Sequence, residues 1–263
     1  MALHQSLPQR LLDIHDLDLW HFHVSVTPGK FHEPVFPPDR VAIAFNRWMF
    51  SAISPSIKGR VLEIGSGIGN ISAFLLDTDK HVTLSDLRPE YCEYLSSHFK
   101  ENQSLESVEQ FDLIDKDFDK KYNKLLNSYD TVFALNVVEH IEDDNQAIFN
   151  CRKLLKEGGT LIILVPSYQW LFCRMDRELG HFRRYNRRSL ANLFKQNGFS
   201  VDKLFNFNAA GVFGWFLFGK IFQSRQLKKS QMNVYNKLVS IFILIDRLLF
   251  RIFGLSLIII GRK

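Results

Sequence analysis

The chain has 263 residues, of which 46% are hydrophobic and 23% charged, and its formal net charge is +5. These values are typical of a globular protein with one large domain, or one domain with an elaborated lid. The widely spaced cysteines, the polar first ten residues and the lack of about 18 consecutive apolar residues argue against a disulfide framework, a signal peptide and a spanning helix, and favour a cytoplasmic location.

The positive charge is concentrated at the end of the chain. Residues 202–263 contain ten Lys or Arg and two Asp, and the segment is also rich in apolar side chains. A basic and apolar segment favours contact with an anionic surface such as lipid headgroups, at the inner face of a membrane. A solvated basic face without a partner explains the same composition equally well.

The first 57 residues are expected to form an N-terminal arm and a lid helix. The arm is rich in Pro, His and aromatic residues, which indicates irregular structure. Apolar residues then recur at helical spacing from Val41 through Phe45 to Met49, and Asp39 is placed to cap the helix.

From residue 58 to 208 the pattern alternates between strands and helices. Several of the strands are continuous apolar runs, which is typical of a parallel sheet covered by helices on both faces. The expected strands are Arg60–Ile64, His81–Ser85, Ser107–Phe111, Thr131–Leu135, Thr160–Val165 and Phe199–Phe205. The expected helices are Asn70–Leu76, Pro89–Lys100, Asp143–Leu155 (capped by Asp143 and ended by Gly158-Gly159) and Arg188–Gln196.

Residues 209–254 interrupt this alternation before a final core strand at 255–263. The interruption is mostly apolar with a helical period, and it is much longer than a plain connection between two strands. We therefore interpret it as a hydrophobic helical insertion. It serves as a lid, a peripheral membrane contact, a homodimer interface or additional core, and the sequence does not choose among these.

A glycine-rich turn separates the first strand from the first helix of the core. Gly65, Gly67 and Gly69 allow the backbone to turn sharply and to approach a ligand. The turn departs from the G-x-G-x-x-G dinucleotide fingerprint, because Asn70 occupies the third glycine position. Glu63, just before the turn, suits a cationic ligand end such as an ammonium better than a pyrophosphate.

Polar residues follow the next three strands at the same edge of the sheet. Asp86 can accept both hydroxyls of a ribose, Asp112 can accept from an adenine amino group with Leu113 against the ring, and Asn136 ends the fourth strand. A helix cap for Asp86 and a turn aspartate for Asp112 are the structural alternatives.

Taken together, these segments resemble class I S-adenosylmethionine-dependent methyltransferases. The resemblance rests on VLEIGSGIGN at 61–70, VTLSD ending at Asp86, FDL at 111–113, NVVEHIEDD at 136–144 and LLKEGGTLIILVPS at 154–167. It implies an α/β fold with a doubly wound, mostly parallel seven-stranded sheet, Rossmann-like, whose last strand is antiparallel. The segments DRELGHFRRY at 176–185 and GLSLIII at 254–260 also look like a bacterial subgroup with small-molecule or lipid-linked acceptors.

The resemblance implies S-adenosylmethionine as the methyl donor and S-adenosylhomocysteine as the product. It assigns the methionine moiety, ribose, adenine and sulfonium to separate parts of the sheet edge. The implied cofactor-binding residues are Glu63, Gly65, Ser66, Gly67 and Asn70, then Asp86 and Leu87, then Asp112 and Leu113, and finally Asn136 and Val137.

Methyl transfer from a sulfonium requires alignment of the acceptor with the methyl carbon, and a base only when the acceptor must lose a proton. Four candidates for catalytic residues follow the fourth and fifth strands: His140, His181, Tyr168 and Tyr185. His140 and its neighbour Glu139 equally suit packing against the next helix, and the arginines around His181 equally suit a solvated patch.

The sequence predicts a methyltransferase acting on a small, apolar, aromatic or lipid-linked acceptor, with O-methylation favoured. Nucleic-acid or protein methylation and a non-catalytic cofactor-binding scaffold are the alternatives. No nucleic-acid partner is expected, because the basic segment is apolar and Phe-rich rather than Lys-rich. No metal site is expected, because no His or Cys spacing suggests zinc and Asp143 fits a helix cap.

Overall fold

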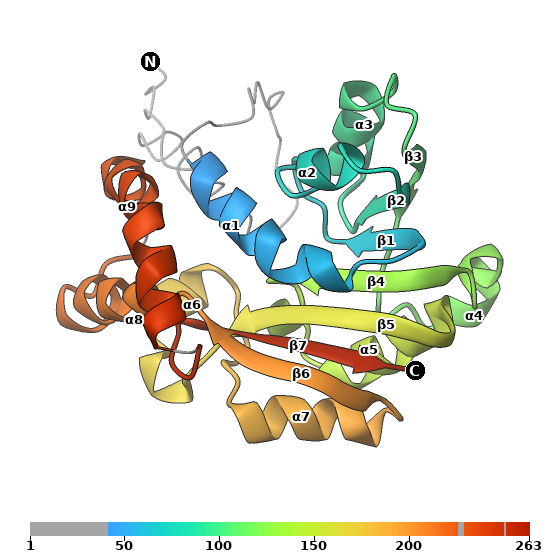
Figure 1. Ribbon diagram of the computed structural model, residues 1–263. Helices are drawn as coiled ribbons and strands as arrows, with labels where there is room; N and C mark the ends of the chain where they lie inside the picture. Colours follow the sequence, from blue (N-terminus) through green and yellow to red (C-terminus); the bar gives the residue numbers. More distant parts are fainter. Residues whose placement is uncertain (1–41, 226–228, 250) are drawn as a thin grey trace, which may run out of the picture.

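The computed structural model describes residues 42–225, 229–249 and 251–263. Its centre is one seven-stranded sheet in the order β3-β2-β1-β4-β5-β7-β6 (Figure 1). The N-terminal arm, including the capping role predicted for Asp39, lies outside the described residues. The strands are β1 Arg60–Ile64, β2 His81–Asp86, β3 Leu105–Gln110, β4 Tyr129–Leu135, β5 Leu155–Pro166, β6 Ser200–Phe207 and β7 Ser256–Arg262.

Helices cover both faces of the sheet (Figure 1). They are α1 Ile43–Ile53, α2 Ser72–Leu76, α3 Pro89–His98, α4 Phe118–Lys121, α5 Asp144–Leu154, α6 Arg174–Glu178, α7 Arg187–Gln196, α8 Ala209–Trp215 and α9 Lys229–Leu248. Side chains of α1, α2, α3 and α9 form one hydrophobic core against the sheet, and those of α4, α5 and α7 form the other.

The continuous apolar strands are explained by this two-sided burial. In β1, Val61 packs into the core beneath α1, and its neighbour Leu62 packs into the core beneath α5. Because successive side chains of a strand point to opposite faces, a strand covered on both sides has no polar face. The predicted doubly wound fold is therefore confirmed.

The last strand lies antiparallel between two others. β7 pairs antiparallel with β5 and with β6, so that Ile260 lies opposite Ile162 on one side and Lys203 on the other. The pairs among β1 to β5 are all parallel. The seven-stranded arrangement with an antiparallel last strand is confirmed.

Two predicted boundaries are wrong. Gly158 and Gly159 do not end a helix but lie inside β5, which starts at Leu155 directly after α5. The Gly158 N–H donates to the Lys263 carbonyl, and the Lys263 N–H donates to that of Gly159, so sheet pairing extends the strand through the glycines. The third strand also starts earlier, at Leu105, and ends before Phe111, which turns into the core. The Asp143 cap of α5 is confirmed by the bond from the Gln146 N–H.

The insertion consists of α8, a π-helical turn at Phe216–Ile221, and α9. The buried Asp246 carboxylate of α9 accepts from the N–H groups of Asn208 (2.7 Å) and Ala209 (2.6 Å), which fixes the start of α8 against α9. Helix α9 also packs on α1 (Figure 1). Among the described residues, no helix has the length and apolar content needed to cross a membrane.

Candidate functional site

The glycine turn after β1 brings two strand ends together. Gly65, Gly67 and Gly69 have φ angles of 76°, 55° and 81°, and a side chain at Gly69 would collide with the ring of Phe99. The N–H groups of Gly65 and Ser66 both donate to the Ser85 carbonyl at 2.8 Å. The predicted sharp turn is confirmed, because this left-handed backbone is readily adopted only by glycine.

Glu63 is buried at the end of β1, and its carboxylate faces the glycine turn. One oxygen accepts a hydrogen bond from the Ser72 hydroxyl at 2.6 Å. Burial raises the pKa of Glu63 to about 7, against the effect of the bonds from Ser72 and Ser66. Near neutral pH the Glu63 carboxyl group is therefore close to its titration point. A cationic partner such as an ammonium stabilises its ionised form.

Asp86 at the end of β2 holds the glycine turn in place. One carboxylate oxygen accepts from the Gly67 N–H at 2.9 Å, and the other accepts from the Arg88 N–H at 3.0 Å. The side chain is 1% exposed. Asp86 therefore joins the ends of β1 and β2. Its bond to Gly67 goes beyond the alternative role of a helix cap.

The segment after β3 presents one apolar side chain to solvent. Asp112 accepts from the Ile114 N–H at 2.9 Å, as expected of a turn aspartate. Leu113 is 4% exposed and belongs to the core, whereas Ile114 is 43% exposed. Leu87, after β2, is 55% exposed. Ile114 and Leu87 therefore offer apolar surface at this edge.

Asn136 follows β4 in the left-handed backbone region, with a φ of 56°. Its N–H donates to the Leu164 carbonyl at 2.8 Å. Its neighbour Val137 is 8% exposed and packs into the core. Asn70, after the glycine turn, is half-buried.

A cavity opens at the carboxyl ends of these strands, with an empty volume of about 900 Å³ that includes open solvent at its mouth. Its polar wall includes Glu63, Gly65, Ser66, Asn136, His181 and Arg184. Its apolar wall includes Phe45 and Met49 of α1, Phe207 of β6, Trp215 of α8 and Met232 of α9.

A buried ion network stands behind the polar wall. The Asp176 carboxylate lies 3.0 Å from Nδ1 of His181 and accepts from Nε of Arg184 at 2.7 Å. Arg184 also donates to the Ser167 carbonyl and lies 4.5 Å from the ring of Trp215. Burial lowers the pKa of His181 and that of Arg184, and Asp176 opposes both shifts. The network fixes His181 and Arg184 at the cavity.

The other candidates for catalytic residues lie elsewhere. The Tyr185 hydroxyl donates to Asp144 at 2.7 Å from within the core beneath α5, and burial raises its pKa. Tyr168 packs against Trp170 and Phe253. Neither lines the cavity described above.

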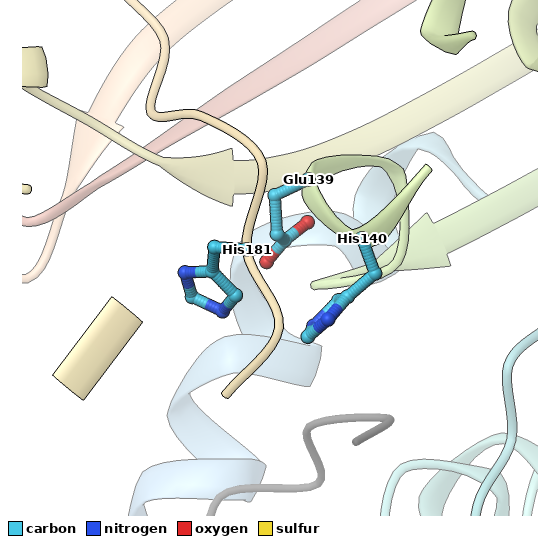
Figure 2. A group of neighbouring side chains, drawn as sticks. All are labelled: Glu139, His140 and His181. Carbon is cyan, nitrogen blue, oxygen red and sulfur yellow. The ribbon is translucent and has the colours of Figure 1, made fainter. Parts of the chain in front are cut away.

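Glu139, His140 and His181 form a separate group next to the cavity (Figure 2). Glu139 and His140 belong to a single 3₁₀ turn after β4, Val138–His140. The rings of His140 and His181 meet edge to face, with centroids 4.7 Å apart. Burial raises the pKa of Glu139 to about 8.

Comparison with known proteins identifies one domain of the chain. Residues 62–161 match the family model described as a methyltransferase domain. A ubiquinone biosynthesis O-methyltransferase of Xanthomonas campestris is 30% identical over 156 residues, which cover 52% of this chain and 62% of that protein. The chain thus spans less than two thirds of the length of this curated relative. Residues 62–161 therefore match a methyltransferase domain.

Solved structures show the same fold. An S-adenosylmethionine-dependent methyltransferase from Archaeoglobus fulgidus has 16% identity and a TM-score of 0.54, covering 83% of this chain and 94% of that one. The phosphoethanolamine N-methyltransferase 2 of Haemonchus contortus, in complex with S-adenosylmethionine, has 19% identity and a TM-score of 0.55, covering 83% and 52%. At these identities the two structures show a shared fold.

The polar groups at the sheet edge fit S-adenosylmethionine. A buried carboxylate at Glu63 suits the cationic methionine end, and the open glycine turn suits close approach of a ligand to the backbone. The individual roles predicted for the cofactor-binding residues and for His140, His181, Tyr168 and Tyr185 stay predictions.

Sequence reasoning missed the apolar wall of the cavity. The helical period of α1 indicates that Phe45 and Met49 share an apolar face, but no local signal shows that this face meets the sheet edge. Arg184 was one of several arginines interpreted as a possible solvated patch, and the structure buries it at 5% exposure. Its position three residues after the Gly180-His181 step gave no indication of the bond to Asp176.

Proposed function

We propose that this protein transfers a methyl group from S-adenosylmethionine to a hydroxyl group of a small, apolar or lipid-linked acceptor. The observation behind the proposal is the division of the cavity into two walls. Strand ends supply its polar wall, and α1, β6, α8 and α9 supply its apolar wall. A cavity of this kind suits an acceptor with one polar end and an apolar body.

The polar groups of the domain are proposed to hold the donor. Glu63 binds the ammonium of the methionine moiety, and Asp86 accepts from the ribose hydroxyls while it keeps the glycine turn in place. Ile114 and Leu87 flank the adenine, since they are the exposed apolar side chains after β3 and β2. The sulfonium of the cofactor supplies the activated methyl group.

The apolar wall is proposed to hold the acceptor and to exclude water. Phe45, Phe207 and Trp215 all line the cavity, and the rings of Phe45 and Phe207 pack together. Trp48 in turn packs on Phe207 with a centroid distance of 4.4 Å. In an in-line displacement, a rigid wall that aligns the nucleophile supplies much of the rate. Trp215 is held in place by its contact with Arg184.

An oxygen nucleophile is favoured over an amine. His181 and Arg184 face the cavity, and the positive charge of Arg184 opposes a protonated amine there. A hydroxyl can donate to Nε2 of His181, and a hydroxyl or phenolate can accept a hydrogen bond from Arg184. The similarity to ubiquinone biosynthesis O-methyltransferases supports the same choice.

The insertion is proposed to contact an anionic membrane surface from one side. Residues 209–254 contain seven Lys or Arg and one Asp, and that Asp246 is buried. Apolar side chains at helical spacing stay exposed along one side of α9: Val234, Leu238, Ile241, Leu244 and Leu248, at 37–67%. Apolar area combined with basic charge is what interfacial helices use to bind anionic lipid.

A methyl-transfer assay with S-adenosylmethionine tests the proposal. The acceptor panel contains simple phenols, hydroquinones with isoprenoid tails, primary amines and oligonucleotides. We expect transfer to hydroxyl acceptors, with a lower KM for those with apolar tails. A preference for amines or oligonucleotides would contradict the proposal, and tight cofactor binding without transfer to any acceptor would favour a scaffold.

A further inference from the structure

Three side chains that the fold brings together form a candidate metal centre beside the cofactor cavity. One ligand atom from each of Glu139, His140 and His181 lies within 4.8 Å of the others. Figure 2 shows the Glu139 carboxylate and the two imidazole rings around one common space. The first two residues come from the turn after β4, and the third comes from the loop between α6 and α7. No motif spacing in the sequence predicts this group.

Glu139 is the observation that points to a ligand. Its side chain is fully buried, and neither carboxylate oxygen has a hydrogen-bond partner among the described residues. Buried carboxylates are otherwise paired, hydrogen-bonded or bound to metal, since an isolated charge in the interior is strongly unfavourable. A cation at the common space would satisfy both oxygens.

His181 is oriented for the same purpose. Its Nδ1 lies 3.0 Å from the Asp176 carboxylate, which also accepts from Nε of Arg184. Because this carboxylate can only accept when it is ionised, Nδ1 is the ring nitrogen that donates, and the Nε2 lone pair points away from Asp176. Figure 2 shows the Nε2 edge of the ring turned toward Glu139 and His140. A carboxylate behind a histidine is the usual second layer of a metal site.

We propose that Glu139, His140 and His181 bind a divalent transition-metal ion of the Zn²⁺, Co²⁺ or Fe²⁺ type. Two imidazoles and one carboxylate suit these ions, whereas Mg²⁺ and Ca²⁺ prefer oxygen ligands alone. Three protein ligands leave a position open for a water or substrate oxygen. Because His181 also lines the cavity, an acceptor hydroxyl can take that position, which is a role that rests on the proposed function.

The test measures binding of Zn²⁺ or Co²⁺ alone to the tag-free, chelator-treated full chain by calorimetry and, for Co²⁺, by visible absorption. Because the chain has nine histidines, the readout is the difference between the parent and the Glu139→Gln variant. We expect one strong site that Glu139→Gln weakens at least 100-fold, and that Asp176→Asn weakens 10- to 100-fold. His98→Gln, which changes an exposed histidine of α3, is the matched control and keeps the site.

Glu139→Gln replaces a buried carboxyl by a neutral group of the same shape, so it is expected to fold. Its melting temperature without metal verifies this, and added Zn²⁺ raises the melting temperature of the parent only. Equal metal binding by parent and variant, binding of Mg²⁺ alone, or no strong site in the parent would overturn the proposal. Titration with S-adenosylmethionine separates this failure from that of the proposed function, because cofactor binding does not depend on the metal group.

Discussion

The sheet edge and the insertion differ in how their side chains are satisfied. At the edge, the polar groups bond one another: Asp86 accepts from Gly67 and Arg88, and Ser72 donates to Glu63. In the insertion, large apolar side chains stay exposed, including Phe213 at 71% and Ile252 at 72%. The family match also covers residues 62–161 and does not reach the insertion.

In the proposed function, this difference separates donor binding from acceptor binding. The proposed donor site consists of backbone turns and short polar side chains, which the geometry of parallel strand ends supplies. The acceptor wall is built in part from α8 and α9, which join the core through apolar contacts and the Asp246 bonds. Changes at the edge should therefore affect cofactor affinity, and changes in the insertion should affect folding, membrane contact and acceptor choice.

The largest effect is expected for Asp86→Ala. The variant loses the acceptor for the ribose and the bond that holds Gly67, so the Kd for S-adenosylmethionine should rise at least ~100-fold, or ~3 kcal/mol. Calorimetric titration measures it. Asp79→Ala, with a side chain that is 93% exposed, is the matched control and should bind like the parent. Equal affinity of the two variants would contradict the role of Asp86.

Asp246→Ala tests how the insertion is joined to the core. It leaves the N–H groups of Asn208 and Ala209 without their buried acceptor, so the free energy of unfolding should fall by about 2 kcal/mol. Urea denaturation gives this value. Asp202→Ala, which removes an exposed ion pair with Arg262, should cost less than about 1 kcal/mol. A loss no larger than that of Asp202→Ala would mean that these bonds do not secure the insertion.

The double variant Ile241→Glu/Leu248→Glu tests the exposed side of α9. Two apolar contacts are lost and two like charges face anionic lipid, so binding to phosphatidylglycerol vesicles should drop at least ~10-fold in co-sedimentation. Phe149→Glu, an exposed apolar position on α5, is the control. If the parent does not bind vesicles and elutes as a dimer, and the double variant elutes as a monomer, this side of α9 is a dimer interface instead.

The smallest effect is a pH dependence of cofactor binding. The ionised form of Glu63 binds the ammonium, and its pKa in the free protein is about 7. The ionised fraction rises from about one tenth at pH 6 to about nine tenths at pH 8, so affinity should rise about ninefold over that range. S-adenosylhomocysteine is the preferred probe because it lacks the sulfonium. Glu63→Gln should bind weakly with a flatter profile, and an unchanged slope would assign the titration to another group.

Much of the fold followed from local patterns, and the errors have local causes. The strands were recognisable because burial on both faces removes polar positions from them. The β5 boundary was missed because Gly158 and Gly159 are stabilised in the strand by pairing with Lys263, at the far end of the chain. The two glycines alone predicted the end of a helix at this point.

The candidate site divides in the same way. The placement of Glu63, Asp86 and Asn136 was predictable, because the carboxyl ends of parallel strands lie at the same edge of a sheet. Leu113 was predicted to lie against the ligand; it packs in the core while Ile114 is exposed, and its role stays a prediction.

The sequence by itself determined the order of strands and helices along the chain and the glycine turn, because these depend on backbone preferences and periodicity. The tertiary structure decided which side chains meet. Arg184 and Tyr185 are neighbours in the chain, yet one bonds Asp176 at the cavity and the other bonds Asp144 beside α5. Glu139 and His181 meet through packing between distant segments, which no local pattern encodes.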